Sequence, residues 1–94
     1  MNKYELVYVL STTQGDEAVA AASEKVQALV ASKGTVTNVE EWGRRKLAYE
    51  IRDEKEGFYV VVNFEAAADA PYEIDRILKI NEEVLRYLLI RKDN

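Results

Sequence analysis

Residues 58–64 read Phe-Tyr-Val-Val-Val-Asn-Phe and are the segment of this chain most typical of a β-strand. All of them except Asn63 are β-branched or aromatic, the two classes of side chain that strands favour. We therefore expect this segment to form a central strand, with the rest of a sheet built around it.

The first third of the chain has the pattern of a strand followed by a helix. Residues 4–10 predict the strand, and Val7 and Val9 indicate that the face opposite its main apolar face is also partly covered. From about Asp16 the apolar residues recur at the helical period instead. Gly34 follows this helix at the place where a left-handed C-terminal cap is expected.

The middle of the chain predicts two further extended segments and a turn. Residues 35–42 have the strand pattern, and Gly43 interrupts it as a bulge or tight bend would. Residues 47–51 continue in extended form. We expect residues 52–57, which are mostly charged and end in glycine, to form the tip of a hairpin that leads into the central strand.

The last third repeats the order of helix and strand. Pro71 suits the first turn of a short helix, in which Asp75 and Lys79 have the favourable i,i+4 spacing. Residues 81–83 predict a turn, and residues 84–91 predict the final strand. The order of elements is therefore βαββαβ.

This order predicts an α+β fold of the ferredoxin-like, split βαβ type. Two helices would cover one face of a four-stranded antiparallel sheet. We expect residues 1–94 to form a single domain, because the chain contains no linker, repeat or low-complexity tract. The other face of the sheet would carry no helices, so it should be partly apolar and available to a partner.

The composition argues against catalysis. The chain has 94 residues, a net charge of −4, no cysteine and no histidine. It therefore lacks a thiol nucleophile, a thiolate metal site and the commonest general base. We expect no enzymatic activity, cofactor, metal or small-molecule substrate. No apolar run approaches the ~20 residues that span a bilayer, and the N-terminus lacks the apolar core of a signal peptide, so we expect a cytoplasmic protein.

Positive charge is concentrated in one stretch of this acidic chain. Residues 42–49 read Trp-Gly-Arg-Arg-Lys-Leu-Ala-Tyr, with three consecutive cations between an aromatic-glycine pair and an apolar run. Arginine is suited to bidentate binding of phosphate or carboxylate groups. The stretch therefore predicts contact with an anionic or polar partner.

The segment from Trp42 to Ile51, in its context, resembles the bacterial small-subunit ribosomal protein six (S-six) family. The resemblance covers essentially the whole chain, and the other matching positions are Tyr4-Glu5, Glu40-Glu41, Gly57-Phe58-Tyr59 and Leu85-Arg86. Two departures stand out. Glu50 replaces the usual proline after Leu-Ala-Tyr, and we expect a more continuous strand edge there. The chain stops at Asn94, where many members carry a polar tail, so we expect any contact made by that tail to be missing.

The resemblance implies a structural role in the small ribosomal subunit. Family members pair with small-subunit ribosomal protein eighteen, and the heterodimer binds the central domain of the small-subunit rRNA. We predict that contacts with the partner protein or RNA come from Glu40, Glu41, Trp42, Arg44, Arg45, Lys46 and Tyr49. A second set of cations, on the neighbouring first and last strands, is predicted to contact rRNA: Lys3, Arg86, Arg91 and Lys92.

The predicted contact residues also have simpler explanations that involve no partner. The charges at residues 44–46 could serve only to keep an exposed sheet edge from pairing with other edges. Trp42 and Tyr49 could be core aromatics at a strand bend, and the second set of cations could be scattered surface charge.

Two other functional classes share the predicted fold. An RNA-recognition motif that binds single strands on its own has the same element order, and Gly57-Phe58-Tyr59-Val60 mimics the start of its third strand. However, Val60 and Asn63 stand where that motif places stacking aromatics, and Glu56 replaces a basic residue. A ferredoxin-like regulatory domain that binds a small ligand is the third class.

Overall fold

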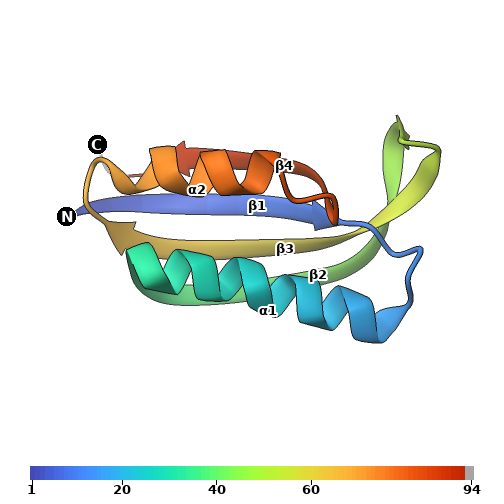
Figure 1. The fold of residues 1–94 in the computed structure, drawn as a ribbon, viewed down its shortest axis with the longest axis horizontal. Coiled ribbons are helices and arrows are strands. Elements are labelled where there is room, and N and C mark those ends of the chain that lie inside the picture. The colour runs from blue at the N-terminus through green and yellow to red at the C-terminus, as the bar shows by residue number, and fades with distance from the viewer. Residues whose placement is uncertain (93–94) are drawn as a thin grey trace.

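The computed structural model describes residues 1–92 and contains a four-stranded sheet with two helices. The elements in chain order are β1 (Asn2–Leu10), α1 (Asp16–Lys33), β2 (Gly34–Ile51), β3 (Glu54–Ala66), α2 (Ala70–Lys79) and β4 (Val84–Arg91). All neighbouring strands are antiparallel, in the order β2-β3-β1-β4, and both helices lie on the same side of the sheet (Figure 1). The predicted ferredoxin-like fold and the central position of residues 58–64 are confirmed.

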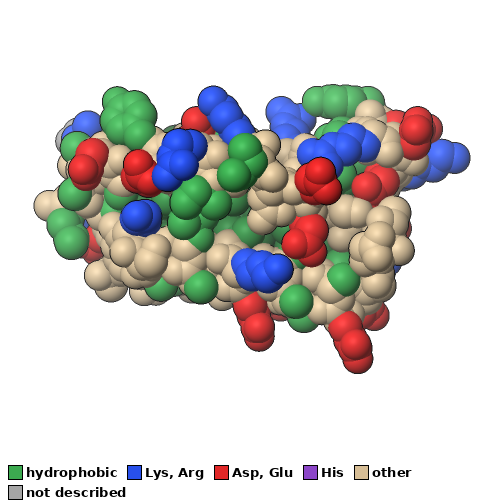
Figure 2. Space-filling model, viewed as in Figure 1, with side chains coloured by type: hydrophobic (Ala, Val, Ile, Leu, Met, Phe, Trp, Pro, Cys, Tyr) green, Lys and Arg blue, Asp and Glu red, His purple; other side chains and the backbone are tan. Residues whose placement is uncertain are grey.

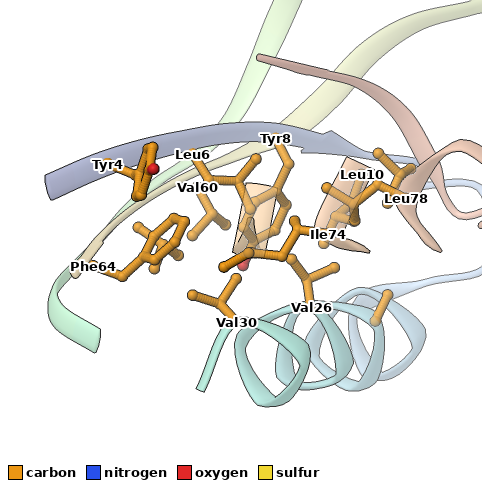
Figure 3. Close-up of a cluster of buried hydrophobic side chains, with 14 of the residues drawn as sticks. Tyr4, Leu6, Tyr8, Leu10, Val26, Val30, Val60, Phe64, Ile74 and Leu78 are labelled. Carbon is orange, nitrogen blue, oxygen red and sulfur yellow. The ribbon is translucent and has the colours of Figure 1, made fainter. Parts of the chain in front are cut away.

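The main core lies between the sheet and the helices. Alternate residues of β1 and β3 point toward the helices and meet the apolar stripes of α1 and α2, as Figure 3 shows. Tyr8 is fully buried there, and its hydroxyl is hydrogen-bonded to Ser23 of α1 at 2.9 Å, so a buried polar pair is satisfied. On the helix-covered side, acidic and basic side chains are interspersed over the surface (Figure 2).

Gly34 ends α1, but the predicted left-handed cap is wrong. Its φ of −170° is extended backbone that any residue can adopt. Glycine is needed for a different reason: a Cβ at this position would lie 2.3 Å from the carbonyl oxygen of Glu65 on the neighbouring strand. Close approach of two backbones, and not the local conformation, therefore excludes a side chain.

The hairpin between β2 and β3 is longer than the sequence pattern indicates. β2 runs without a break from Gly34 to Ile51, so the segment between residues 42 and 47 is also extended. The turn contains only Arg52 and Asp53, and residues 54–57, which were expected in the turn, belong to β3. Arg52 and Asp53 both have positive φ, 52° and 65°, as two-residue hairpin turns of the favoured twist require.

The ends of the chain show smaller differences from the prediction. β1 begins at Asn2, two residues earlier than the pattern indicates, and β4 has the predicted bounds. The departure from the family at the C-terminus involves residues 93–94, which lie outside the described residues. No helix in the described part of the chain is long and apolar enough to cross a membrane.

Candidate partner and RNA interface

The end of the β2–β3 hairpin bends over the face of the sheet that carries no helices. Lys46 pairs with Glu56 and Ile51 with Glu54, so the four residues 47–50 oppose a single residue of β3 and bow out of the sheet. In Figure 1 this end of the hairpin turns away from the line of the other strands. We call residues 44–57 the arch.

The arch packs on the sheet through a small apolar cluster. Leu47 is buried against Val9 of β1 and Leu85 at the start of β4. A Cβ at Gly57 would lie 2.3 Å from Val9 Cγ1, so the absence of a side chain there lets the arch approach β1. This contact confirms the prediction that the second face of residues 4–10 is partly covered, since Val9 is only 4% exposed.

Arg44 ties the base of the arch to α1. Its guanidinium forms ion pairs with Asp16, at the first turn of α1, and with Glu56 of β3 at 2.9 Å. Hydrogen bonds to these two carboxylates raise the pKa of Arg44 above its usual value. The side chain that the sequence predicts as a partner contact is therefore engaged within the chain.

Arg52 ties the tip of the arch to the turn before β4. Its guanidinium donates hydrogen bonds to the carbonyl oxygens of Glu82, at 2.8 Å, and Val84, at 3.1 Å. Next to the tip, Ser11 donates a hydrogen bond to Glu54 at 2.8 Å. The arch is thus fixed at several points and holds a defined position over the sheet.

A groove of about 220 Å³ opens between the arch and the uncovered face of the sheet. Its apolar floor comes from β1, β3 and β4, and the arch forms its wall. The residues that line it include Val7, Val9, Leu47, Tyr49, Tyr59, Arg86 and Leu88. At its rim Arg86 donates a hydrogen bond to the Tyr49 hydroxyl at 2.8 Å, which joins β4 to the arch.

Trp42 and Tyr49 are surface residues, so the interpretation of both as core aromatics is wrong. Trp42 is 48% exposed and lies in the bulge between Glu41 and Gly43, where the pairing with β3 shifts. The guanidinium of Arg45 lies 5.6 Å from the centroid of the Trp42 ring, a cation–π distance. Tyr49 is 62% exposed at the rim of the groove. Both aromatics are thus presented to solvent, Tyr49 on the arch itself and Trp42 just before it in β2.

The remaining predicted contact residues of β2 lie along one outer edge of the sheet. Glu40, Glu41, Arg45 and Lys46 are all exposed, and β2 has a neighbouring strand on one side only. Within residues 1–92, neither Arg45 nor Lys46 forms an ion pair with a carboxylate. These two cations are therefore available to an external anion. Glu50 lies in the bowed segment, where pairing with β3 is broken, so the more continuous strand expected from the missing proline is not seen at this position.

The second predicted set of cations is divided by the fold. Lys3, Arg91 and Lys92 lie together at one end of β1 and β4, where the Lys92 amide donates to the Lys3 carbonyl at 2.7 Å. Lys92 also pairs with Glu5 at 3.6 Å. Arg86 is five residues away along β4, about 17 Å at the rise of a strand, and belongs to the groove. The four predicted residues therefore do not form one basic cluster. Lys3, Arg91 and Lys92 form a group at one end of the sheet, which we call the terminal group, and Arg86 lies apart from them in the groove.

The groove and the role of Arg52 could not be predicted from the sequence pattern. The groove depends on contacts between residues far apart in the chain, such as Leu47 with Val9, which no local pattern reveals. The one sequence signal that pointed toward the groove was the apolar pair Val7 and Val9, which lie on the face of β1 without helices.

In the described part of the chain, no group of acidic residues is arranged to hold a metal ion.

Comparison with known proteins identifies the family. Residues 3–91 match the family model described as Ribosomal protein S6. The chain is 50% identical over 91 residues to the small ribosomal subunit protein bS6 of Alkaliphilus oremlandii, with 97% of each chain covered. It is 49% identical over 90 residues to the small ribosomal subunit protein bS6 of Clostridioides difficile, with 96% of this chain and 98% of the relative covered. The crystal structure of 30S ribosomal protein S6 from Thermotoga maritima superposes with a TM-score of 0.91 at 26% identity, covering 97% of this chain and 87% of that one. The chain therefore belongs to the ribosomal protein S6 family and is a structural, non-enzymatic component of the small ribosomal subunit in the bacterial cytoplasm.

Proposed function

We propose that this chain pairs with small-subunit ribosomal protein eighteen and that the pair binds the central domain of the small-subunit rRNA. The observation that carries the proposal is the arch. It brings exposed aromatics, available cations and an apolar groove together at one end of the uncovered sheet face. Family membership supports the ribosomal setting, and the arch supplies a surface of the required kind.

The protein partner is assigned to the groove and the adjacent aromatics. Tyrosine, tryptophan and arginine are the residues that most often anchor protein interfaces. Trp42 and Tyr49 are exposed, and Arg45 lies against the Trp42 ring. Glu40 and Glu41 on the same strand add negative charge, which would guide a basic partner into position and favour it over acidic ones.

RNA is assigned to the cations that the chain itself leaves available. Arg45 and Lys46 are exposed on the outer edge of β2 and form no ion pair within residues 1–92. The terminal group of Lys3, Arg91 and Lys92 is a weaker second candidate, because Lys92 already pairs with Glu5 and Arg91 bonds to Asn2. With a net charge of −4, most of the chain repels RNA. We therefore expect weak RNA binding by the chain alone and strong binding only with a basic partner.

Arg44 has a different role in this proposal from its neighbours. Because it is paired with Asp16 and Glu56, it positions the arch, and contact with RNA falls to Arg45 and Lys46. The two aromatics and two cations then form the contact surface, while Arg44 and Arg52 hold that surface in place.

The two alternative functions receive less support from the fold. Of the residues of β1 and β3 on the uncovered face, Tyr59 is the aromatic one, and it is half-buried in the groove under the arch, so the open stacking platform of an RNA-recognition motif is missing from the described residues. The groove, at about 220 Å³, is smaller than the ~300–1,000 Å³ typical of small-molecule sites. A larger hollow of about 640 Å³ beside Arg52 is lined mostly by polar and acidic side chains, whereas small-molecule sites are lined predominantly by apolar and aromatic ones.

A gel-shift titration tests the proposal. A central-domain rRNA fragment is titrated with this chain, with protein eighteen, and with both together. We expect strong binding only with both, weakened by Arg45→Gln/Lys46→Gln and not by the control Arg76→Gln/Lys79→Gln, which removes the same charge from α2. Loss of two phosphate contacts should reduce the slope of log affinity against log salt by about 2. Tight binding of short single strands by this chain alone would contradict the proposal.

A further inference from the structure

The groove is sized for a single side chain. Its volume of about 220 Å³ can admit an aromatic or a large aliphatic group but little beyond it. Its floor is formed by valine, leucine and tyrosine side chains, which offer few hydrogen-bond donors or acceptors to a polar ligand. A pocket of this kind is typical of the sites in which an interface anchor residue is buried.

The apolar surface continues out of the groove along β4. Leu88, on the groove floor, is 55% exposed, and Ile90, two residues further on the same face of the strand, is 38% exposed. β4 is an edge strand with a neighbour on one side only. A partner segment that places a side chain in the groove would therefore meet further apolar surface beside it.

Arg86 gives this apolar site one charge. Among the described residues its guanidinium bonds only to the neutral Tyr49 hydroxyl, although arginine carries five N–H donors. Arg44, Arg76, Lys79 and Lys92, by contrast, are all paired with carboxylates of the chain. In a chain of net charge −4, a cation at the groove rim without a carboxylate of its own marks a place for an external one.

We propose that the groove receives one apolar side chain of the protein partner and that Arg86 binds a carboxylate lying next to it on the same segment. This inference rests on the proposed pairing with protein eighteen and names the chemistry of its contact. An apolar residue beside an aspartate, a glutamate or a C-terminal carboxylate has both required groups. A nucleotide fits less well, because the floor offers little to the polar edges of a base.

Titration calorimetry with purified protein eighteen tests the apolar contact in the groove and the charged contact at Arg86 separately. Leu88→Ser tests the apolar contact, with Ile80→Ser as the control, because Ile80 is 76% exposed beside α2 and away from the groove. Arg86→Gln tests the charge, with Arg76→Gln as the control on α2. We expect each groove variant to weaken binding by roughly tenfold or more, as loss of an interface anchor does, and each control to leave it unchanged.

Charge reversal identifies the carboxylate. Arg86→Glu should weaken binding more than Arg86→Gln, and replacing one acidic residue of the partner by lysine, or amidating its C-terminus, should restore it. Absence of rescue across all acidic positions of the partner would overturn the assignment of a carboxylate.

The outcomes separate this inference from the proposed function. If the wild-type chain binds protein eighteen and the groove variants bind it equally well, the groove inference is wrong and the pairing stands. If the variants instead weaken only rRNA binding by the assembled pair, the groove is an RNA site and the inference is again wrong. If the wild-type chain does not bind protein eighteen at all, the proposed function itself fails.

Discussion

The sheet has an apolar cluster on each face, and the two differ in size and in what they hold together. The cluster on the helix side contains sixteen buried residues from both helices and from β1, β3 and β4. The cluster under the arch contains three, Val9, Leu47 and Leu85, with Ile51 and Tyr59 at its margin. The large cluster accounts for the fold, whereas the small one shapes a surface. Substitutions in the two clusters should therefore separate stability from partner binding.

The largest effect on stability is expected on the helix side. Phe64 is 1% exposed and stacks on Tyr4 with ring centroids 5.4 Å apart. Phe64→Ala should lower the free energy of unfolding by about 3–5 kcal/mol, the usual cost of such a truncation. Urea denaturation measures it. An effect under about 1 kcal/mol would show that this cluster does not carry the stability of the fold.

A smaller loss of stability, with a larger loss of binding, is expected under the arch. Leu47 is 8% exposed and joins only a small cluster. Leu47→Ala should lower the free energy of unfolding by an amount at the lower end of the ~2–5 kcal/mol range for buried leucine, because neighbouring side chains can close around the smaller alanine. It should also weaken binding of protein eighteen, measured by calorimetry at a temperature where the variant stays folded. Unchanged binding would remove the arch from the interface.

Arg44 should affect binding without a comparable effect on stability. Its two ion pairs are exposed, and such pairs contribute little to folding. Arg44→Gln should leave the melting temperature nearly unchanged but weaken partner binding several-fold, because the arch loses one of its attachments. Asp16→Asn should weaken binding in the same direction, and the double variant should add little to either change. Fully additive effects would mean that Arg44 contacts the partner directly.

The smallest effect concerns pH and lies on the helix side. The Tyr87 hydroxyl donates a hydrogen bond to the Asp75 carboxylate at 2.5 Å, and burial together with this carboxylate raises the pKa of Tyr87 to about 12. Because this folded-state pKa lies above the value of ~10 in an unfolded chain, the stabilisation is complete below about pH 10. It is lost as the pH rises toward about 12.

The matched variant isolates this contribution. Between about pH 10 and 12, the melting temperature of the wild-type chain should fall further than that of Tyr87→Phe, which has no phenol to titrate. Parallel curves for the two proteins would show that Tyr87 is not perturbed in the folded state.

The fold was predictable because its signals are local. The change of apolar period from residues 4–10 to the helix that begins at Asp16, and back to strand in residues 58–64, sets the order of the elements. The bulge at Gly43 was also visible in sequence, since an isolated glycine in a strand pattern indicates one, and its φ is 80°.

The arch was not predictable in the same way. Its turn has positive φ at Arg52 and Asp53, without the Asn-Gly or Asp-Gly pair that usually marks such a turn. Its position depends on the hydrogen bonds of Arg52 to the carbonyl oxygens of Glu82 and Val84, 30 and 32 residues further along the chain, and on packing that Gly57 permits. The sequence pattern identified the chemical groups of the candidate site, but it could not distinguish Arg44, which is paired internally, from Arg45 and Lys46.

The most direct test of the account is to map the surface that protein eighteen covers. Amide chemical shifts of the isotope-labelled chain would be recorded as unlabelled partner is added. We expect changes concentrated at residues 42–52 and 86–90, with Val7 and Val9, and few changes on α1 and α2. Changes centred on the helices, or at the end of the sheet that carries Lys3 and Lys92, would contradict the assignment of the arch and groove as the protein interface.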